Sequence, residues 1–359
     1  MITMLLGDIC PTVHSAPLYA EGNTEALFGD AVSIFRDRDF IFANVECAIT
    51  ESDGKIAKFG PNLKAPIATA KVLSDLGLTV AGISNNHVFD FGRQGALDTM
   101  KYLKESGIDY TGFGENYEDS RKNYTYEKNG EKICVIAVCE HEYSYALEDR
   151  MGSRPFDEFE TIEDIRRAKE THDRVIVAYH GGKEHCKYPS PRLMRACRAM
   201  IRNGANLVLC QHSHCIGVYE KYEGGHIVYG TGNFHFTKLV DTEGWKTGLA
   251  VIYDTKKNSL EFIPVREHDT GITLAKGEDR EQILRAFEER SADKESWKEG
   301  WHAFCESMQG MYKRNIMRAC LDDSTERENA AFGHYLDCEA HTDVWRELFP
   351  TYNATNEKD

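Results

Sequence analysis

The sequence predicts an α/β fold built from two mixed β-sheets that pack together, with helices on the outside. Strand-like and helix-like segments alternate along most of the chain, a pattern typical of βαβ units. Hairpin signals interrupt this alternation, and the clearest is Asn129-Gly130 between two β-like runs. Because crossover helices join parallel strands and tight turns join antiparallel ones, we expect both kinds of strand pairing.

The first hundred residues show the expected alternation in its simplest form. The predicted elements are, in order, strands at 2–7 and 40–46, a helix at 67–77, a strand at 78–83 and a helix at 93–107. Each strand is a short apolar run, which is typical of strands buried on both faces. The helices end at Gly77 and Gly107, and glycine is common just beyond a helix C-terminus.

The alternation continues after the predicted hairpin and ends in a β-rich stretch. The predicted elements are, in order, a helix at 161–172, a strand at 174–180, a helix at 190–203 and a strand at 206–212. The runs "GHIVYGTGNFHF" and "GLAVIYDTKKNSLEFIPV" follow, with a turn near 256–258. These runs are rich in β-branched and aromatic residues, so we expect them to complete the sheets.

The character of the sequence changes near residue 276. Large apolar residues recur there at helical spacing, namely Trp297, Trp301, Phe304, Met308 and Met311. Such a stripe indicates an amphipathic helix whose apolar face packs against a core. We therefore predict an α/β domain over residues 1–275 and a helical C-terminal extension, packed on that domain, over residues 276–359.

The charge of the chain excludes some classes of partner. The formal net charge is −15. Non-specific nucleic-acid binding needs a basic face, and docking on an anionic membrane surface needs basic clusters. We therefore expect no nucleic-acid partner. An acidic protein can still bind a small or oligomeric anionic substrate where metal ions supply positive charge.

Sequence features favour a cytoplasmic location. No segment approaches the roughly 20 consecutive apolar residues that a membrane-spanning helix needs. The first ten residues lack the charged start and the long apolar run of a signal peptide. The eleven cysteines show no paired CxxC spacing, which is typical of reduced thiols.

Polar side chains follow several predicted strands at the point where each strand ends. They are Asp8, Asn44, Glu46, Asn86, His87, His180, His212 and His214. The carboxyl ends of the strands in an α/β sheet form the edge at which ligands bind. Carboxylates, imidazoles and an amide together favour Mn, Fe or Zn over an all-oxygen Ca or Mg site. We therefore predict divalent metal ions at this edge.

The His212-x-His214 pair and a carboxylate at the same edge could serve one ion or two adjacent ions. If the strand continues, the two imidazoles point the same way, and if it turns at Ser213 they can reach two adjacent ions. A carboxylate can bridge two ions about 3.5–4 Å apart, as in two-metal hydrolases.

Seven sequence motifs occur in the order known from one protein family. They are "GDI" (7–9), "ANVECAIT" (43–50), "LKAP" (63–66), "SNNHVFDFG" (84–92), "YHGGKEH" (179–185), "GANLVLCQHSH" (204–214) and "VYGTGNFHF" (228–236). The chain resembles the calcineurin-like metallophosphoesterases, in particular their capsule-synthesis branch (CapA, or PGA-cap), which is associated with poly-γ-glutamate. The resemblance covers roughly residues 2–265 and implies a four-layer fold, in which two packed mixed sheets are flanked by helices.

The resemblance also implies roles for individual residues. One metal ion would bind Asp8 and His214, a second would bind Asn86, His180 and His212, and Glu46 would bridge them. His87 would act as a general acid or stabilise charge beside the substrate. Asp90 would either orient His87 or cap the helix near Arg93. We expect Asn85 to shape the turn.

Other residues are candidates for contacts with the substrate. Lys64, Glu184 and Asn44 are assigned to substrate binding, and Lys183 and Arg93 are further candidates for holding an anionic group. For the basic side chains, solvated surface charge is the alternative interpretation.

The sequence departs from the family pattern at two places. Cys10 stands where the wider superfamily has a ligand histidine, so it is either a soft ligand or, as we favour, a buried thiol. His14 is a further possible replacement. The family's H-W-G-x-E-Y motif reads His180-Gly-Gly-Lys-Glu-His185 here, so we expect a different substrate pocket.

The leading functional hypothesis is a metal-dependent hydrolase of phosphoesters, or of an amide in a poly- or oligoglutamyl chain. One alternative is a metal-independent acid/base enzyme, such as a peptide epimerase, on the same scaffold. Another is a non-catalytic protein of capsule or polymer assembly.

Overall fold

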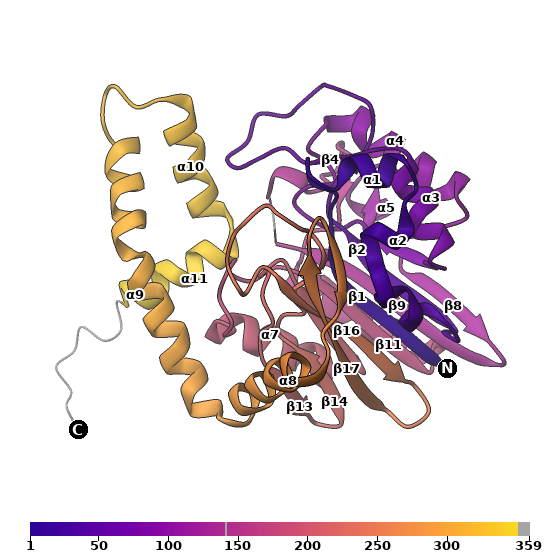
Figure 1. The fold of residues 1–359 in the computed structure, drawn as a ribbon. Coiled ribbons are helices and arrows are strands. Elements are labelled where there is room, and N and C mark those ends of the chain that lie inside the picture. Colours follow the sequence, from indigo (N-terminus) through magenta and orange to yellow (C-terminus); the bar gives the residue numbers. More distant parts are fainter. Residues whose placement is uncertain (141, 351–359) are drawn as a thin grey trace.

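A computed structural model describes residues 1–140 and 142–350, and two large sheets form its body (Figure 1). The first sheet has the strand order β18-β17-β16-β1-β2-β5-β6, with β15 beside β1. Its strands are β1 (Ile2–Ile9), β2 (Phe40–Val45), β5 (Val80–Gly82), β6 (Asp109–Thr111), β15 (Asn233–His235), β16 (Thr247–Asp254), β17 (Ser259–His268) and β18 (Gly271–Leu274). Strands β1, β2, β5 and β6 run parallel, whereas β16, β17 and β18 pair antiparallel, so the sheet is mixed.

The second sheet is also mixed and has the order β13-β14-β12-β11-β9-β8. Its strands are β8 (Tyr124–Lys128), β9 (Glu131–Cys139), β11 (Arg174–His180), β12 (Leu207–Gln211), β13 (Tyr219–Tyr222) and β14 (Gly225–Val228). The four inner strands are parallel, and β8 and β13 pair antiparallel at the two edges. Asn129 and Gly130 join β8 to β9 with positive φ angles of 54° and 76°, as a two-residue hairpin of type I′ requires.

The two sheets pack face to face, and helices cover their outer faces. Phe42 and Val251 of the first sheet meet Val135 and Leu209 of the second in one buried cluster. Helices α3 (Ala68–Asp75) and α4 (Gly92–Glu105) cover the first sheet, and α6 (Glu158–Thr171) and α7 (Pro191–Arg202) cover the second. The predicted four-layer α/β architecture is therefore confirmed.

The remaining elements of the body are short. They are α1 (Ala16–Ala20), α2 (Thr24–Phe28), η1 (Gly29–Phe35), β3 (Ala48–Ile49), β4 (Lys64–Ala65), β7 (Phe113–Gly114), α5 (Tyr117–Ser120), η2 (Glu142–Ser144) and β10 (Gly152–Ser153). The pairs β3–β4 and β7–β10 form two small separate sheets.

Four helices follow the last strand: α8 (Gly277–Ala292), α9 (Lys294–Ala319), α10 (Glu326–Asp337) and α11 (Glu339–Leu348). Figure 1 shows α9, α10 and α11 together at one side of the body. Trp297 packs against Tyr229 of the body, and Trp301 is buried in a cluster that joins the helices to Cys186 of the body, as the apolar stripe predicts. The division into two domains stays a prediction.

A buried polar network attaches α11 to the body. Asp343 accepts hydrogen bonds from Ser190 Oγ at 2.6 Å and from Arg192 Nε at 2.9 Å. Arg192 also pairs with the buried Glu140 at the end of β9. Within the described residues, no helix combines the length and the apolar composition that crossing a membrane requires.

Candidate metal centre

The carboxyl ends of central strands from both sheets meet at one edge and deliver polar side chains there. Asp8 lies in β1, Glu46 directly follows β2, Asn86 follows β5, His180 ends β11, and His212 and His214 follow β12. We call these six residues the sheet-edge cluster. Asp8, Glu46, His180, His212 and His214 are all buried. The six predicted metal ligands therefore come together although they span more than 200 positions of sequence.

Asp8 is held in place by hydrogen bonds to both carboxylate oxygens. Oδ1 accepts from Asn44 Nδ2 at 2.7 Å, and Oδ2 accepts from the backbone N–H of His212 at 3.0 Å. Burial raises the pKa of Asp8, and the neighbouring His214 together with these hydrogen bonds opposes that rise. A carboxylate fixed in this way presents its remaining lone pairs to the centre of the cluster.

Glu46 lies at the middle of the cluster, and its carboxylate is buried without hydrogen-bond donors in the described part of the chain. Both of its carboxylate oxygens are buried, and none of the described residues donates a hydrogen bond to either of them. Oε1 lies 3.5 Å from His180 Nε2 and 3.9 Å from His214 Nε2. Burial, followed by the charge of Asp8, raises the pKa of Glu46 well above its usual range. A buried carboxylate without donors is costly unless a cation compensates it.

The three histidines of the cluster have the chemistry of metal ligands. Burial lowers the pKa of His214 and lowers the pKa values of His180 and His212 well below their usual range. Neutral imidazoles keep a lone pair for coordination. Asn233 Oδ1 accepts a hydrogen bond from His214 Nδ1 at 2.9 Å, which leaves Nε2 as the nitrogen directed to a ligand role.

The sheet-edge cluster contains two overlapping groups, and within each group the potential ligand atoms lie within 4.8 Å of one another. One group is Asp8, Glu46 and His180, and the other is Glu46, His212 and His214. Glu46 is common to both, which is the arrangement expected of a bridging carboxylate. His214 Nδ1 nevertheless lies 3.5 Å from Asp8 Oδ2, so the distances do not divide the histidines between two ions. The predicted division stays a prediction.

The backbone turns sharply between His212 and His214. Strand β12 ends at Gln211, and the two histidines have positive φ angles of 79° and 52°. The alternative with a turn at Ser213 is therefore confirmed. Positive φ is uncommon outside glycine, and such conformations cluster at functional sites.

Gly7 allows a third segment to approach the cluster. A Cβ atom at Gly7 would lie 2.2 Å from the carbonyl oxygen of Gly232. Strand β15 therefore runs beside β1, with Asn233 paired to Asp8. This pairing joins the "GDI" and "VYGTGNFHF" motifs, and Asn233 also contacts His214.

A second polar group lies beside the cluster. Asp90 Oδ2 accepts hydrogen bonds from His87 Nδ1 at 2.6 Å and from the N–H of Leu63 at 2.7 Å. Phe91, not Asp90, is the N-cap of α4, so of the two alternatives for Asp90 the structure shows the contact with His87. Lys58 forms an ion pair with Asp90 and lies 3.3 Å from His87 Nδ1.

The pKa of His87 reflects these neighbours. Burial lowers it, Lys58 lowers it further, and Asp90 opposes both effects. Asn85 fixes the loop that carries His87, because Asn85 Oδ1 accepts from the N–H groups of His87 and Val88 at 3.1 and 2.9 Å. The predicted role of Asn85 in the turn is confirmed.

The residues assigned to the substrate are found in three different surroundings. Glu184 lines the cavity described below. Asn44 lies behind the cluster, where its Nδ2 donates to Asp8 and lies 3.1 Å from His180 Nδ1, so it contacts two residues of the cluster. Lys64 lies away from the cavity and contacts Asp53 and the Phe91 ring. The basic residue that sequence reasoning missed is Lys58, which lies in an irregular segment without any pattern.

The remaining sequence candidates also fall into place. Lys183 lines the cavity, whereas Arg93 pairs with the exposed Glu115. Cys10 is a buried thiol whose pKa is raised by burial and then by Cys47, and it belongs to none of the potential ligand groups in the described part of the chain. His14 is exposed.

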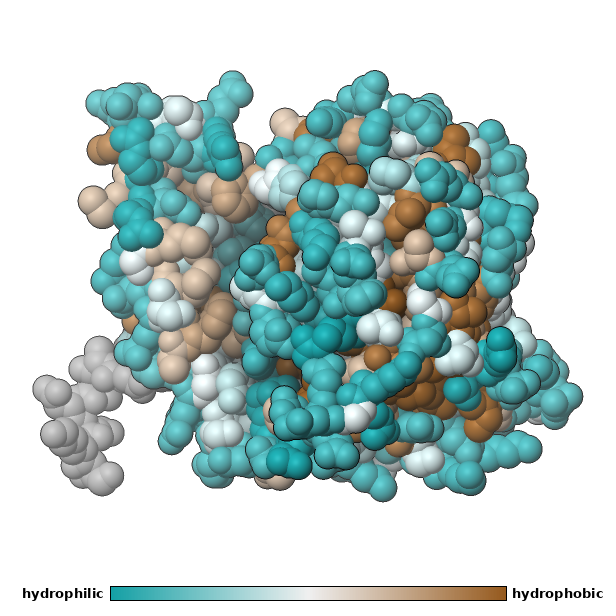
Figure 2. All heavy atoms as spheres, viewed as in Figure 1, coloured by the Kyte–Doolittle hydropathy of each residue, from teal (hydrophilic) through white to brown (hydrophobic). Residues whose placement is uncertain are grey.

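A cavity of about 320 Å³ opens between the sheet-edge cluster and the C-terminal helices. On the body side, its lining includes Asn86, His87 and His212. On the helical side, it is lined by residues of α9, α10 and α11. Figure 2 shows the surface hollowed between the helices and the body. The sheet edge and the C-terminal helices therefore share one cavity.

Comparisons with known proteins agree on a family. Residues 3–238 match the model of the family described as "Bacterial capsule synthesis protein PGA_cap". The chain is 30% identical over 274 residues to the PGA biosynthesis protein CapA of Bacillus subtilis, covering 74% of this chain and 71% of that protein. It is 29% identical over 274 residues to the capsule biosynthesis protein CapA of Bacillus anthracis, covering 73% and 65%.

The aligned region spans about two thirds of the length of these relatives. A hypothetical protein from Thermus thermophilus has a solved structure that aligns with a TM-score of 0.47 at 14% identity, covering 75% of this chain and 100% of that one. The family match ends before α8, so helices α8 to α11 lie outside it.

Proposed function

The chain belongs to the bacterial capsule synthesis protein (PGA_cap) family, and from that premise we propose that it is a metal-dependent hydrolase of phosphoesters. The reaction takes place where the sheet-edge cluster faces the cavity. The observation that carries this proposal is Glu46, a buried carboxylate that accepts no hydrogen bond from any described residue. It lies among a second carboxylate and three histidines whose pKa values are lowered by burial.

These residues fit divalent metal ions by their chemistry. Asp8, Glu46, Asn86, His180, His212 and His214 would hold them, and the mixture of O and N donors favours Mn, Fe or Zn. When bound, two such ions polarise a phosphoryl oxygen and make water a nucleophile near neutral pH. A cation would also offset the cost of burying two carboxylates close together.

His87 is the residue that moves a proton. Its Nδ1 donates to Asp90, which fixes the ring orientation and leaves Nε2 to exchange a proton. A protonated Nε2 would donate to the leaving oxygen of the substrate as the bond breaks. Lys58 and the N–H of Leu63 hold Asp90 in turn, so the pair is rigidly supported.

An anionic substrate fits the proposed centre. The names of two relatives refer to capsule and PGA biosynthesis, and we extend to this chain only the expectation of an anionic oligomer or small molecule. Lys183 lines the cavity and would add positive charge to that of the metal ions. Cleavage of an oligoglutamyl amide is the second reaction that this centre would support, since metal ions polarise carbonyl oxygens as well.

Elemental analysis combined with activity assays tests the proposal. Protein purified without chelator should contain roughly two equivalents of Mn, Fe or Zn at this centre. It should cleave bis-p-nitrophenyl phosphate, and a chelator should abolish that cleavage. Replacing the phosphodiester by an oligoglutamate peptide distinguishes the two reactions.

Variants separate loss of metal from loss of structure. His212→Ala should lower metal content and activity, whereas His226→Ala, a buried histidine that is bonded to Tyr219 outside the cluster, should leave both unchanged. Metal-free wild-type protein with full activity on a peptide would instead support the acid/base alternative. Bound metal without any hydrolysis would favour the assembly protein.

A further inference from the structure

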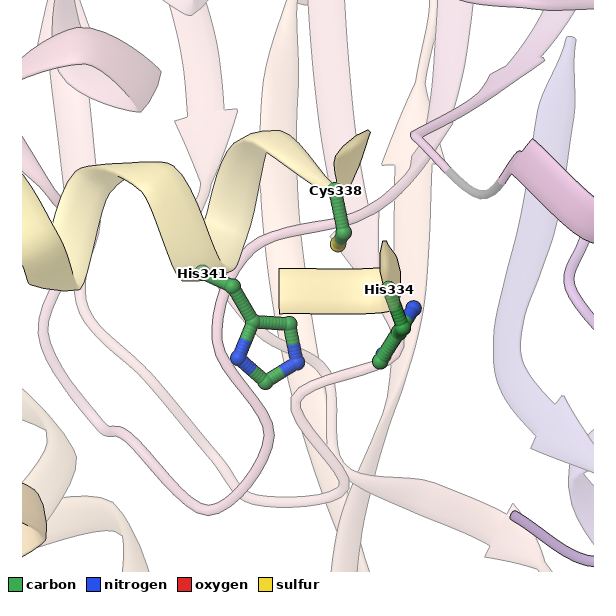
Figure 3. Close-up of side chains that lie close together, drawn as sticks. All are labelled: His334, Cys338 and His341. Atoms are coloured by element: carbon green, nitrogen blue, oxygen red, sulfur yellow. The ribbon is translucent and has the colours of Figure 1, made fainter. Parts of the chain in front are cut away.

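Three side chains with metal-ligand chemistry gather where α10 meets α11, on the cavity wall opposite the sheet-edge cluster. They are His334, Cys338 and His341, which we call the helix-junction cluster. One potential ligand atom from each lies within 4.8 Å of those of the other two. Figure 3 shows the three side chains around a common space between the two helices. All three line the cavity.

The local backbone fixes this arrangement. His334 lies in the last turn of α10, and Cys338 is both the C-cap of α10 and the N-cap of α11. The N–H of Cys338 donates to the carbonyl of His334 at 3.0 Å, and the N–H of His341 donates to the carbonyl of Cys338 at 3.0 Å. Residues four and three positions apart are therefore brought to one side of the junction.

Aromatic residues hold the two imidazoles. The Tyr312 hydroxyl is hydrogen-bonded to His341 Nδ1, so Nε2 is the nitrogen of His341 that would coordinate a metal. The His334 ring stacks on Tyr143, with ring centroids 5.7 Å apart. Fixing one imidazole nitrogen through a neighbouring polar group is the usual way in which proteins orient histidine ligands.

We propose that the helix-junction cluster is a zinc site. A thiolate with two imidazoles is a soft donor set that suits Zn²⁺ and is unsuited to Mg²⁺ or Ca²⁺. Tetrahedral zinc, with Zn–N near 2.0–2.1 Å and Zn–S near 2.3 Å, places one sulfur and two nitrogen ligands roughly 3.3–3.6 Å apart. The three ligand atoms lie within 4.8 Å of one another, so side-chain movements of about an ångström would bring them to that spacing.

Three protein ligands leave one position of a tetrahedral ion for a ligand from outside. Because all three side chains line the cavity, this position faces the space where a substrate would lie. An open position on zinc accepts water or an anionic oxygen. The site would therefore bind a carboxylate or phosphate oxygen of a ligand whose other end lies at the sheet edge.

Metal binding by the helix-junction cluster is independent of the proposed hydrolase activity, and only the binding of a substrate between the two clusters rests on that activity. The family match ends at residue 238, so the helix-junction cluster lies outside it. The sheet-edge cluster contains no cysteine, so a metal–thiolate signal reports on the helix-junction cluster alone.

Cobalt substitution provides the decisive test. The full-length protein loaded with Co²⁺ should show the charge-transfer absorption of a thiolate–cobalt bond in the near-ultraviolet. Cys338→Ser should abolish this band and lower the zinc content by about one equivalent. Cys305→Ser is the matched control, because Cys305 is a buried thiol in α9 outside the cluster, and it should retain both.

Two more variants keep the test decisive. His334→Gln changes a half-buried residue on a helix surface, so the protein should fold even where Cys338→Ser does not, and its zinc affinity should fall at least about tenfold. Glu46→Gln should lose metal at the sheet edge and keep the cobalt–thiolate band. A wild-type protein without the band, or a Cys338→Ser protein with unchanged band and zinc content, overturns the zinc site.

Adding inorganic phosphate to the cobalt protein tests the open position. An open site should shift the thiolate–cobalt band, and Cys305→Ser should behave as wild type. An unchanged band at saturating phosphate would mean that the fourth position is closed, which contradicts that part of the proposal.

Discussion

The sheet-edge cluster and the helix-junction cluster lie on opposite walls of one cavity, yet the chain builds them in opposite ways. The first gathers residues from five strand ends, spread from Asp8 to His214. The second takes all its residues from eight consecutive positions, 334–341. The geometry of the sheet-edge cluster depends on how both sheets fold and pack together, because its residues come from strands of both. A cluster assembled by one helix junction depends on local backbone geometry, so each should respond to different substitutions.

The largest expected effect on activity comes from replacing Glu46, which belongs to both groups of potential ligands in the sheet-edge cluster. Glu46→Gln keeps the shape of the side chain and removes its charge, so metal should be lost there. Metal ions contribute several kcal/mol of transition-state stabilisation, so kcat/KM for a phosphodiester should fall roughly 100-fold or more. Elemental analysis and steady-state kinetics measure this, and the cobalt–thiolate band should not change.

Glu220→Gln serves as the matched control for that variant. Glu220 is a buried glutamate too, but Arg198 and Lys294 neutralise it at 2.8 and 2.6 Å. Its substitution should lower the thermal midpoint without lowering the metal content. Equal metal loss in both variants would mean that Glu46 acts only through the stability of the fold.

The second-largest expected effect, that of a His87 variant, separates proton transfer from metal binding at the sheet-edge cluster. His87→Asn removes the proposed acid while Asp90 keeps its bonds to Lys58 and Leu63. General acid catalysis typically contributes about 10²–10⁴-fold, so kcat should fall by that amount with the metal content unchanged. His226→Asn is the control. Metal loss equal to that in Glu46→Gln would assign His87 to the ligands instead.

The two clusters also differ in how far the sequence reveals them. The apolar runs of the central strands predicted both the sheets and the edge where their polar ends meet, because carboxyl ends of parallel strands converge. Family motifs added the roles. Lys64 was assigned to the substrate, and that role stays a prediction; its ammonium group contacts Ser52 and Asp53, and Lys64 is not among the residues that line the cavity.

Other residues escaped prediction for physical reasons. Lys58 lies in an irregular segment, where no periodicity tells which way a side chain points. The helix-junction cluster escaped because large apolar residues dominated the interpretation of the C-terminal helices. Its signal, a His-x3-Cys-x2-His spacing within eight residues, was present and would have predicted a metal site.

A smaller effect sharpens the comparison at the helix junction itself. Tyr312→Phe removes the hydroxyl that is bonded to His341 Nδ1 but keeps the ring that stacks on Tyr335. Losing such an outer partner typically costs about 10–100-fold in metal affinity, so the zinc Kd should rise by that factor. Competition with a chromophoric chelator measures it. Tyr19→Phe, a buried tyrosine beside His235 in the body, is the control and should leave the Kd unchanged.

The smallest expected effect concerns the point where the C-terminal helices leave the body. Burial raises the pKa of Asp30, but hydrogen bonds from Lys276, the N–H of Leu274 and Thr273 outweigh it and lower that pKa to about 2. A carboxyl group whose pKa is lowered in the folded state stabilises the fold at pH values above its pKa in the unfolded state, which is near 3.8. This contribution disappears as the pH falls towards 2.

Asp30→Asn should therefore destabilise the protein at pH 7 by less than about 1 kcal/mol, since the Lys276 pair is largely exposed. The difference from wild type should shrink between pH 4 and 2 in urea titrations. Because Lys276 directly precedes α8, the same variant tests how the helices are anchored. If the contact between Asp30 and Lys276 helps to hold the C-terminal helices against the cavity, the zinc Kd of Asp30→Asn should change as well. An unchanged Kd would show that the contact of Asp343 in α11 with Arg192 is sufficient to hold the helix-junction cluster in place.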